Sequence, residues 1–342
     1  LKKYLAPLKI CIAKTFGRSR IMRERVVPFL YHRIFSNRPF ALLFDQYQPD
    51  LLFASHIFGR IDTELLAEAK RRGIKTTGMV SCWDHFDKYY LPFKVDMLLA
   101  QSEQVKDFAV EYQGYNPEKI ILTGHPYFDF MVDQKYVAAR SDTLKMLGFP
   151  EEANYVLYVS GSAYCPDEPD IIEGILKQAE QGRFGNNFRL VIRPYQGGRS
   201  RDKEFDKQKY DRFESHPLVS FYRREFWGDL QRSIDFVNIM RHSYGVLAIY
   251  STMTLEAAVM DAPLIGIEFD GYKTRPFNRS VRRFSLREHF KDVFRSGAVA
   301  MAHNFDELFQ VIRGYLDNPK KDQEARERLR MRMCYTLDGH IS

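Results

Sequence analysis

The chain alternates short apolar runs with stretches of helical periodicity, and this alternation restricts its fold more than any other feature. The apolar runs that we predict to be strands are residues 49–55, 75–81, 95–101, 119–124, 154–161, 188–195, 218–223, 246–250, 264–269 and 298–302. Short apolar strands joined by helices are typical of parallel sheets whose two faces are both covered. The sequence therefore predicts an α/β fold.

The alternation falls into two blocks, separated near residues 125–153 by a linker that contains HPYFDF and GFPEE. A chain of 342 residues, 45% of them hydrophobic, is too long for one ordinary domain. We predict two Rossmann-like domains, residues 1–135 and 136–342. The first begins with a basic, helical leader over residues 1–44.

The pattern DTELLAEAKRRG, at residues 62–73, contains both a start and a stop signal for a helix. Asp62 is predicted to cap its first turn. Gly73 is predicted to end it in a left-handed conformation.

Positive charge is concentrated at the start of the chain. Residues 1–38 hold ten Lys or Arg and one acid, Glu24, whereas the remaining residues hold 41 basic and 43 acidic groups. Apolar and aromatic residues interleave with these charges, as in a basic helix that lies on an anionic membrane. Ordinary helices with a solvated basic face explain the pattern equally well. No nucleic-acid recognition motif accompanies it, so no nucleic-acid partner is predicted.

Cysteine use and hydropathy indicate the cellular compartment of the protein. Cys11, Cys82, Cys165 and Cys334 are scattered, with no CxxC pair and no Cys/His spacing suited to zinc. The apolar runs are shorter than the roughly 20 residues that span a bilayer, and no signal-peptide pattern opens the sequence. We predict reduced thiols and a cytoplasmic protein, held at the inner face of the cytoplasmic membrane if residues 1–38 bind lipid.

One turn carries the residues best suited to an anion. Ligands of open parallel sheets bind outside the carboxyl ends of the strands. Ser251 and Thr252 directly follow the strand 246–250, and either is a natural N-cap whose helix start would hold a phosphate. If Thr252 is the cap, Glu256 lies one turn along, where it could accept from ribose hydroxyls. A plain capped helix with a first-turn acid is the alternative.

These residues carry a resemblance to a known family. The pattern STxxxEAAxxxxPLIGI resembles the nucleotide-binding helix of GT-B-type glycosyltransferases. Residues 81–129, from SCWDHFDK to GHPYFD, resemble bacterial surface-polysaccharide transferases of that fold, including relatives of the CDP-glycerol glycerophosphotransferases. The similarity spans roughly residues 45–315. It implies two Rossmann-like domains facing a central cleft, with the donor on the C-terminal one, the acceptor on the N-terminal one, and neither metal nor cofactor.

The resemblance also implies roles for donor-binding residues. Ser251 and Thr252 would hold the donor phosphate, and Glu256 the ribose. The turn GSA, with Gly161 and Ser162, resembles the one by which such enzymes approach the diphosphate closely, although many such turns are purely structural.

Arg193 resembles the Arg of an Arg-Pro step in these families, where a cation would offset the charge of the leaving nucleotide. Many relatives carry His after this Pro, where this chain has Tyr195.

On the N-terminal side, SCWDHFDK follows the strand 75–81 and contains candidates for a general base. Asp84 is the first candidate and His85 the second, because an acceptor hydroxyl must lose its proton as it attacks the sugar carbon. A structural turn capped by Asp84 is the alternative. His56 and His125 are further cleft candidates, the first more typical of a structural hydrogen bond and the second equally suited to donor or hinge.

Three functions remain open. The first is a glycosyltransferase acting from a nucleotide-sugar donor on a surface-glycan or lipid-linked acceptor. The second is another enzyme of the fold, either a CDP-polyol phosphotransferase or a nucleotide-sugar epimerase, the latter less favoured because no SGG-type turn precedes Glu256. The third is a non-catalytic nucleotide or glycan binder. The resemblance further implies that the acceptor half lacks one or more early strands and that the ending LDGHIS is a chain cut near a terminal helix.

Overall fold

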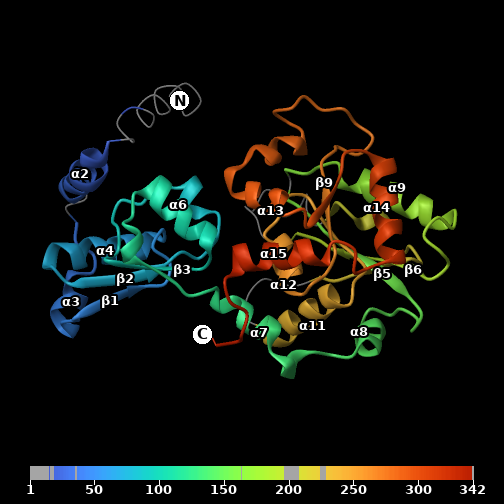
Figure 1. Ribbon diagram of the computed structural model, residues 1–342, viewed down its shortest axis with the longest axis horizontal. Coiled ribbons are helices and arrows are strands. Elements are labelled where there is room, and N and C mark those ends of the chain that lie inside the picture. The colour runs from blue at the N-terminus through green and yellow to red at the C-terminus, as the bar shows by residue number, and fades with distance from the viewer. Residues whose placement is uncertain are drawn as a thin grey trace. The chain divides into compact units, whose positions relative to one another are not determined.

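The chain folds into two compact units, which a computed structural model describes over residues 15, 19–34, 37–162, 164–195, 208–223 and 229–340. The units are Leu1–Gly124 and His125–Ser342, and the predicted boundary at 135/136 falls within the second of them. Each unit contains one parallel sheet (Figure 1). The predicted α/β class and all ten predicted strands are confirmed.

Unit 1 has a four-stranded sheet whose spatial order follows the sequence. Its strands are β1 (Leu51–Ala54), β2 (Lys75–Met79), β3 (Met97–Ala100) and β4 (Ile120–Leu122). The connections hold α4 (Arg60–Arg72), α5 (His85–Lys88) and α6 (Glu103–Gln113). Before β1 come the π-helical turn η2 (Met22–Val26), α2 (Val27–Ile34) and α3 (Ala41–Tyr47), so the described part of the leader is helical, as predicted.

This sequential order leaves one sheet face poorly covered within unit 1. Parallel crossovers are right-handed, so a sheet that grows in one direction receives all its connecting helices on one face. Figure 1 shows α4 and α6 on the same side of the sheet. On the opposite face Leu51, Phe53 and Ile121 remain 56%, 52% and 48% exposed. Full cover of both faces, expected from the sequence, is wrong for the described residues of this unit taken by themselves.

The two signals predicted for α4 have different outcomes. Gly73 ends the helix with φ of 70°, and its N–H donates to carbonyls of the last turn, as predicted. Asp62 is not the cap, because the helix begins at Arg60 and Gly59 occupies the cap position. Asp62 Oδ1 instead lies 3.4 Å from the backbone N–H of His56, so it supports the turn after β1.

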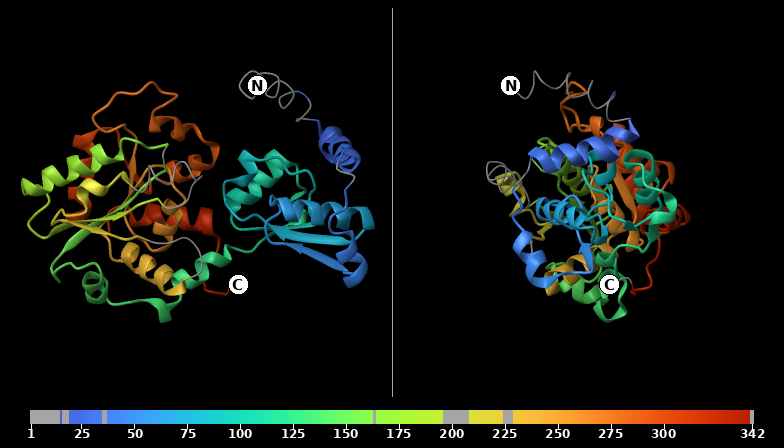
Figure 2. Two further views of the ribbon diagram at one scale, coloured as in Figure 1. Left: turned by 180° about the vertical axis from the view of Figure 1, so that it is seen from behind. Right: turned by 90° about the vertical axis from the view of Figure 1, so that its left-hand side faces the viewer.

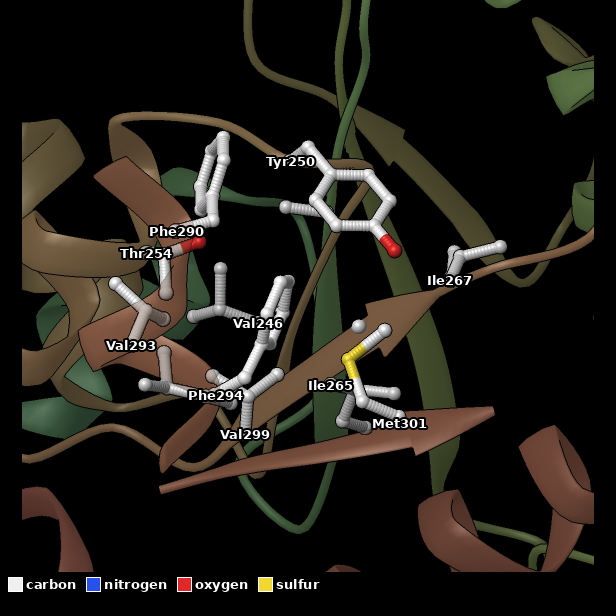
Figure 3. Close-up of a pocket in the computed structure, with 13 residues that line it drawn as sticks. Val246, Tyr250, Thr254, Ile265, Ile267, Phe290, Val293, Phe294, Val299 and Met301 are labelled. Atoms are coloured by element: carbon white, nitrogen blue, oxygen red, sulfur yellow. The ribbon is translucent and has the colours of Figure 1, made fainter. Parts of the chain in front are cut away.

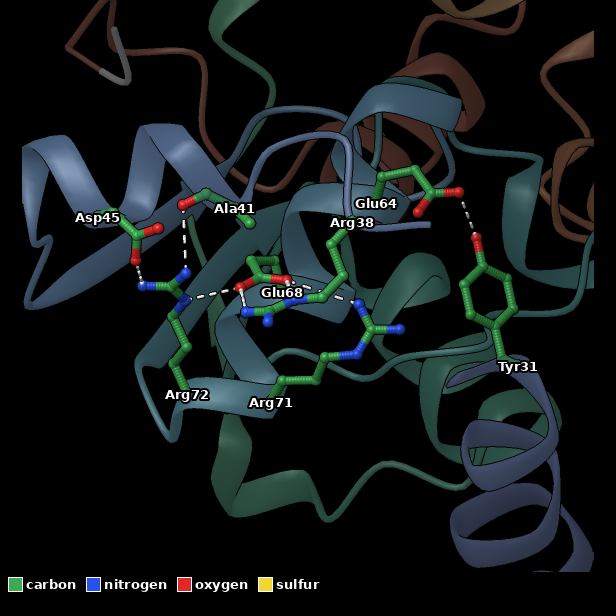
Figure 4. A network of polar contacts seen from close by, with 8 residues as sticks. All are labelled: Tyr31, Arg38, Ala41, Asp45, Glu64, Glu68, Arg71 and Arg72. Atoms are coloured by element: carbon green, nitrogen blue, oxygen red, sulfur yellow. Dashed lines mark hydrogen bonds and ion pairs between the residues drawn. The ribbon is translucent and has the colours of Figure 1, made fainter. Parts of the chain in front are cut away.

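A buried carboxylate ties the segment before β1 to α4 (Figure 4). Glu68 is buried and accepts from Arg38 Nε at 2.9 Å and from Arg72 Nε at 2.6 Å, and Arg71 lies 3.5 Å away. Hydrogen bonds from Arg38, more than from Arg72, lower the pKa of Glu68 to about 2. Arg72 also pairs with Asp45 at 2.7 Å. Part of the basic character around the leader is thus neutralised inside the fold.

Unit 2 has a six-stranded sheet in the order β10-β9-β8-β5-β6-β7. Its strands are β5 (Asn154–Val159), β6 (Phe188–Arg193), β7 (Val219–Phe221), β8 (Val246–Ala248), β9 (Leu264–Ile267) and β10 (Val299–Ala302). Its main helices are α7 (Asp129–Val132), α8 (Arg140–Met146), α9 (Glu168–Glu180), α11 (Leu230–Arg241), α12 (Met253–Val259), α13 (Lys291–Arg295), α14 (Phe305–Asp317) and α15 (Gln323–Cys334).

The order of these strands reverses between β5 and β8. The chain builds β5, β6 and β7 outward in one direction and then returns to add β8, β9 and β10 on the other side of β5. Right-handed crossovers therefore place helices on both faces, as Figure 2 shows. On one face α9 and α14 pack closely, since a Cβ added at Gly174 would lie 2.5 Å from the Phe305 ring. On the other, α12 contacts α15.

In the described part of the chain, no helix combines the length and the hydropathy that crossing a membrane would take.

Candidate functional site

The predicted donor-binding residues of unit 2 gather at the carboxyl ends of adjacent strands. Gly161 and Ser162 follow β5, and Ser251 and Thr252 follow β8, which is hydrogen-bonded to β5. Arg193 ends β6, on the other side of β5. Strand order reverses between β5 and β8, and such a reversal opens the crevice in which doubly wound sheets bind ligands.

The turn after β5 requires glycine for packing. A Cβ at Gly161 would lie 2.8 Å from Cys165 Sγ, a distance that side chains do not tolerate. The Gly161 N–H donates to Glu168 Oε1 at 2.8 Å, so it is engaged by the protein. The neighbouring Ser162 hydroxyl lies 3.5 Å from the Tyr164 N–H. Ala163, the third residue of the predicted turn, lies outside the described residues.

A buried ion pair lies beneath this turn. The side chains of Glu168 and Lys209 are 0% and 1% exposed and pair directly. Tyr158 donates its hydroxyl to the carboxylate at 3.2 Å, and the Tyr210 hydroxyl oxygen lies 3.1 Å from it. Burial raises the pKa of Glu168, against the opposing effect of Lys209.

The same pair fixes the Gly161 carbonyl. Lys209 Nζ lies 3.4 Å from this oxygen, and the Ser160 hydroxyl donates to it at 2.8 Å. Tyr210 donates in turn to the Ser160 hydroxyl at 2.7 Å. Both backbone polar groups of Gly161 are therefore held by buried side chains, which makes the turn rigid.

The turn after β8 begins with a strained residue. Tyr250 has φ of 43°, a left-handed conformation that costs a residue other than glycine about 1–2 kcal/mol. Its ring lies 5.4 Å from that of Phe290 and 5.5 Å from that of Phe294, both edge-on. Figure 3 shows these rings around a small apolar cavity between β8, β9 and β10. The cavity measures about 10 Å³, room for no more than a water molecule, so it serves packing and does not bind a nucleotide.

The hydroxyls after Tyr250 have separate roles. The Ser251 hydroxyl accepts from the Met253 N–H at 3.2 Å. Of the two predicted cap residues, Thr252 occupies the cap position of α12 without a side-chain cap bond, and Ser251 supplies the hydroxyl that bonds the first turn. Glu256 is buried, as is every residue of this short helix. A ribose contact by Glu256 stays a prediction.

Arg193 is buried at the end of β6. Its carbonyl accepts from the Ser160 N–H at 3.0 Å, and its guanidinium lies 4.6 Å from the centre of the Phe236 ring. The side chain is thus stacked against α11, and its contact with a nucleotide stays a prediction.

In unit 1 three predicted residues lie together at the carboxyl ends of β1 and β2. His56 follows β1, and its ring lies 5.3 Å from that of His85, the first residue of α5. Asp84 precedes α5 and makes no side-chain cap bond there. Its carboxylate forms an ion pair with Lys88, one turn along.

His85 has an apolar setting. Its ring meets those of Phe58 and Tyr89 edge-on, at 5.6 and 5.4 Å. Burial lowers the pKa of His85 below its ordinary value and outweighs the neighbouring Asp84 charge. Nδ1 of His85 and Nδ1 of His56 are buried and have no hydrogen-bond partner among the described residues. A neutral imidazole beside a second one is suited to taking a proton near pH 7.

The same loop contains the one set of metal-type donors found among the described residues. Donor atoms of Cys82, Asp84 and His85 lie within 4.8 Å of one another. Burial, more than the neighbouring Asp84, raises the pKa of Cys82 to about 12, so the thiol keeps its proton at neutral pH. Lys88 already supplies a cation to Asp84. A metal ion would have to displace both the proton and the lysine.

His125 begins unit 2 and has a local structural partner. Its Nδ1 accepts from the Tyr127 N–H at 3.2 Å, and its ring packs against Phe128 at 4.9 Å. Burial lowers its pKa to about 4, so the ring is neutral. These contacts cap the short helix that follows, and a donor contact stays a prediction.

The residues that hold the turn after β5 were not predicted from the sequence. Glu168 was not singled out, and Lys209 lies in a segment of mixed charge with no periodic pattern. A long-range pair of this kind leaves no signal in local spacing. An internal acid such as Glu168, seven residues after a Gly-Ser turn, was the only available hint.

No protein-family model matches the chain, and no curated protein matches it. Solved structures do. A UDP-GlcNAc 2-epimerase from Neisseria meningitidis bound to UDP-GlcNAc aligns with a TM-score of 0.53 and 15% identity, over 86% of this chain and 75% of that one. A glycosyltransferase from Rickettsia africae aligns with a TM-score of 0.52 and 14% identity, over 93% of this chain and 80% of that one. The wall teichoic acid polymerase TagF aligns with a TM-score of 0.51 and 11% identity, over 82% of this chain and 72% of that one.

The chain has a GT-B-type fold. These identities establish the fold alone, since one fold hosts different reactions. The predicted two-domain class is confirmed. The predicted cleft, and the donor and acceptor roles of the two domains, stay predictions.

The buried ion pair generates a stability prediction. Lys209→Met leaves the Glu168 carboxylate buried without its cation, so we expect the free energy of unfolding to fall by about 3–5 kcal/mol. Replacing both residues with Met removes both charges and should cost less than the single change. Urea denaturation followed by circular dichroism measures both.

Arg313→Met is the control, because Arg313 pairs with Asp317 on an exposed helix face and should contribute under about 1 kcal/mol. A double variant at least as unstable as Lys209→Met would contradict this account of the pair.

Proposed function

We propose that this protein is a glycosyltransferase that moves a sugar from a nucleotide-sugar donor to an acceptor hydroxyl on a surface glycan or lipid-linked molecule. The observation that carries the proposal is the strand-order reversal in unit 2, which brings the turns at Gly161 and Ser251 to one edge of the sheet. Among the similar structures, three are described as complexes with UDP-GlcNAc or UDP and another as soaked with CDPG, which supports a nucleotide-linked donor.

In the proposed reaction the acceptor oxygen forms a bond to the anomeric carbon of the sugar. The bond between that carbon and the donor diphosphate breaks, and the nucleoside diphosphate leaves. The acceptor proton passes to a base from unit 1. Ser251 and Thr252 would hold donor phosphate, with Glu256 at the ribose.

Two observations support His85 over Asp84 as this base. Asp84 is bound by the Lys88 ammonium, which stabilises the ionised carboxylate and weakens it as a base. The His85 ring, with its lowered pKa, is neutral at pH 7, so one of its ring nitrogens can accept a proton. In this proposal Asp84 orients the loop, and His56 limits the protonation of His85.

Separate replacement of the two residues tests the assignment. His85→Asn should lower kcat by about 10²–10⁴-fold and leave the KM for the donor unchanged, because a base acts in the transition state. Asp84→Asn should lower kcat less. Since the pKa of His85 lies below its ordinary 6.5, the rate should be flat at neutral pH and fall only as the pH drops through that lowered value.

Initial rates with a radiolabelled donor, measured from pH 5 to 8, provide the test. His216→Asn is the control, because His216 is distant in sequence and pairs with Glu180 in unit 2. A loss of rate confined to Asp84→Asn would transfer the role to Asp84.

The other functions give different outcomes in the same assay. UDP, GDP, CDP, dTDP and CMP are first titrated by calorimetry. Conversion of the sugar without any acceptor would indicate an epimerase, and transfer of a polyol phosphate from a CDP-linked donor would indicate a phosphotransferase. Nucleotide binding without turnover would indicate a binding protein.

We also propose that α2 holds the protein at an anionic membrane. Phe29, Leu30 and Ile34 lie on one side of this helix and are 62%, 42% and 68% exposed. Arg33 lies on the same side, and Arg25 is exposed in the preceding turn. Exposed apolar side chains flanked by arginines match the interface of a bilayer with anionic lipid. The rest of the basic segment, up to residue 38, lies partly outside the described residues.

Co-sedimentation with phosphatidylglycerol vesicles tests this surface. Phe29→Asp/Ile34→Asp should weaken partitioning of the protein to the vesicles at least about tenfold, because two apolar side chains that would be buried in the bilayer are lost. Met331→Asp, a change of equal chemistry at an exposed site on α15, should leave it unchanged. Equal binding of all three proteins, or binding to phosphatidylcholine alone, would contradict the proposal.

A further inference from the structure

A second basic segment lies in unit 2, between β9 and β10. Residues 271–287 contain six basic residues and no acid. These are Lys273, Arg275, Arg279, Arg282, Arg283 and Arg287. Lys273 and Arg275 both pair with Asp167, next to the buried Glu168. The other four arginines have no carboxylate partner among the ion pairs of the described residues.

This segment is anchored to the carboxyl edge of the sheet. It leaves β9 at that edge, and Asp270 Oδ1 accepts from the Val281 N–H at 2.8 Å. Ser280 and Val281 are both buried. The short helix η7 (Val281–Leu286) follows, with its first turn capped by the Ser280 hydroxyl. The arginines of η7 therefore extend from a fixed backbone.

One phenylalanine positions two of these arginines. The guanidinium carbons of Arg283 and Arg287 lie 4.3 and 4.9 Å from the centre of the Phe284 ring. The Phe284 ring lies 5.9 Å from that of Tyr250, the strained residue directly before Ser251. Both guanidinium groups are thus held against a ring that packs on the Tyr250 side chain.

The positive charge of Arg283 also acts at Cys165, beside the turn after β5. Burial raises the pKa of the Cys165 thiol, and the Arg283 charge acts against that rise. Cys165 Sγ is the atom that a Cβ on Gly161 would meet.

Stacking on a ring suits these arginines to phosphate. A guanidinium held against an aromatic ring keeps N–H groups available and loses little freedom on binding. Arg283 Nη1 donates to the Ser280 carbonyl at 2.6 Å, which fixes the plane of the group. A diphosphate offers oxygens for two such bidentate contacts. By contrast, Arg193 is buried against Phe236.

We propose that Arg283 and Arg287 bind the diphosphate of the nucleotide donor. The inference rests on the proposed function, because it supplies the cations that neutralise the leaving nucleoside diphosphate. Charge on the diphosphate grows as the sugar departs, so fixed guanidinium groups lower the barrier as well as the dissociation constant.

Calorimetric titration tests the proposal. The wild type is first titrated with UDP, GDP, CDP and dTDP, and the tightest binder is used throughout. Arg283→Met and Arg287→Met should each raise its Kd by about 10–100-fold, because each loses a charge-assisted contact. Binding of the matching nucleoside, which has no phosphate, should not change. Inorganic pyrophosphate should compete with the nucleotide in the wild type and lose most of its affinity in the variants.

Arg212→Met is the matched control. The Arg212 guanidinium also stacks on a ring, 4.7 Å from the centre of Phe213, but pairs with Glu173, so its loss should leave the Kd unchanged. Thermal melting establishes that the variants are folded. Arg283→Lys keeps the positive charge but loses the two-pronged guanidinium group, so its Kd should fall between those of the wild type and Arg283→Met.

The outcomes separate the two proposals. Wild-type protein that binds no nucleoside diphosphate would overturn both the proposed function and this inference. Wild-type binding that survives in Arg283→Met/Arg287→Met would overturn the inference and leave the proposed function standing. Equal losses for nucleotide and nucleoside would also overturn it, because they would indicate a disturbed fold and not a phosphate contact.

Discussion

The reversal of strand order between β5 and β8 is the constraint on which the rest of unit 2 depends. A parallel sheet that grows in one direction has its crossover helices on one face, whereas a reversal distributes them over two. In unit 2 the reversal distributes helices over both faces and places the turns after β5 and β8 at one edge of the sheet, where doubly wound sheets bind their ligands. Unit 1, whose strands follow one another in order, has no such reversal.

The two turns beside this reversal have locally unfavourable geometry, and the surrounding structure stabilises them. Tyr250 adopts a left-handed backbone, and its ring packs edge-on against those of Phe290 and Phe294. Gly161 approaches Cys165 too closely for any side chain, and a buried ion pair fixes both of its backbone polar groups. A buried ion pair is weak support for stability alone, since apolar residues of the same volume often serve better. Its position beneath the turn agrees with a role in holding a binding site.

Much of the fold could be predicted from the sequence, because short apolar runs record burial on both faces of a strand. All ten strands were found in this way. Strand order was not, since the same runs are compatible with a reversal or with steady growth. For the same reason the exposed face at Leu51 and Phe53 had no local signal.

The candidate site was predictable only where chemistry follows a strand directly. Ser251 and His85 stand immediately after strands or at a helix start, and spacing alone located them. Asp62 was misassigned as a cap, because a shift of a few residues in a helix start changes which side chain reaches the free N–H groups. The pair of Glu168 and Lys209 joins residues 41 apart in the chain, and no local pattern encodes it.

The proposed chemistry requires that a nucleotide binds unit 2 at the strand-order reversal. Hydrogen exchange of the full chain, followed by mass spectrometry with and without the tightest-binding nucleoside diphosphate, shows where the nucleotide binds. We expect slower exchange in peptides that cover residues 160–162, 251–254 and 281–287, with no change in the strands of unit 1. Protection confined to unit 1, or to the segment 126–150 of unit 2, would contradict it.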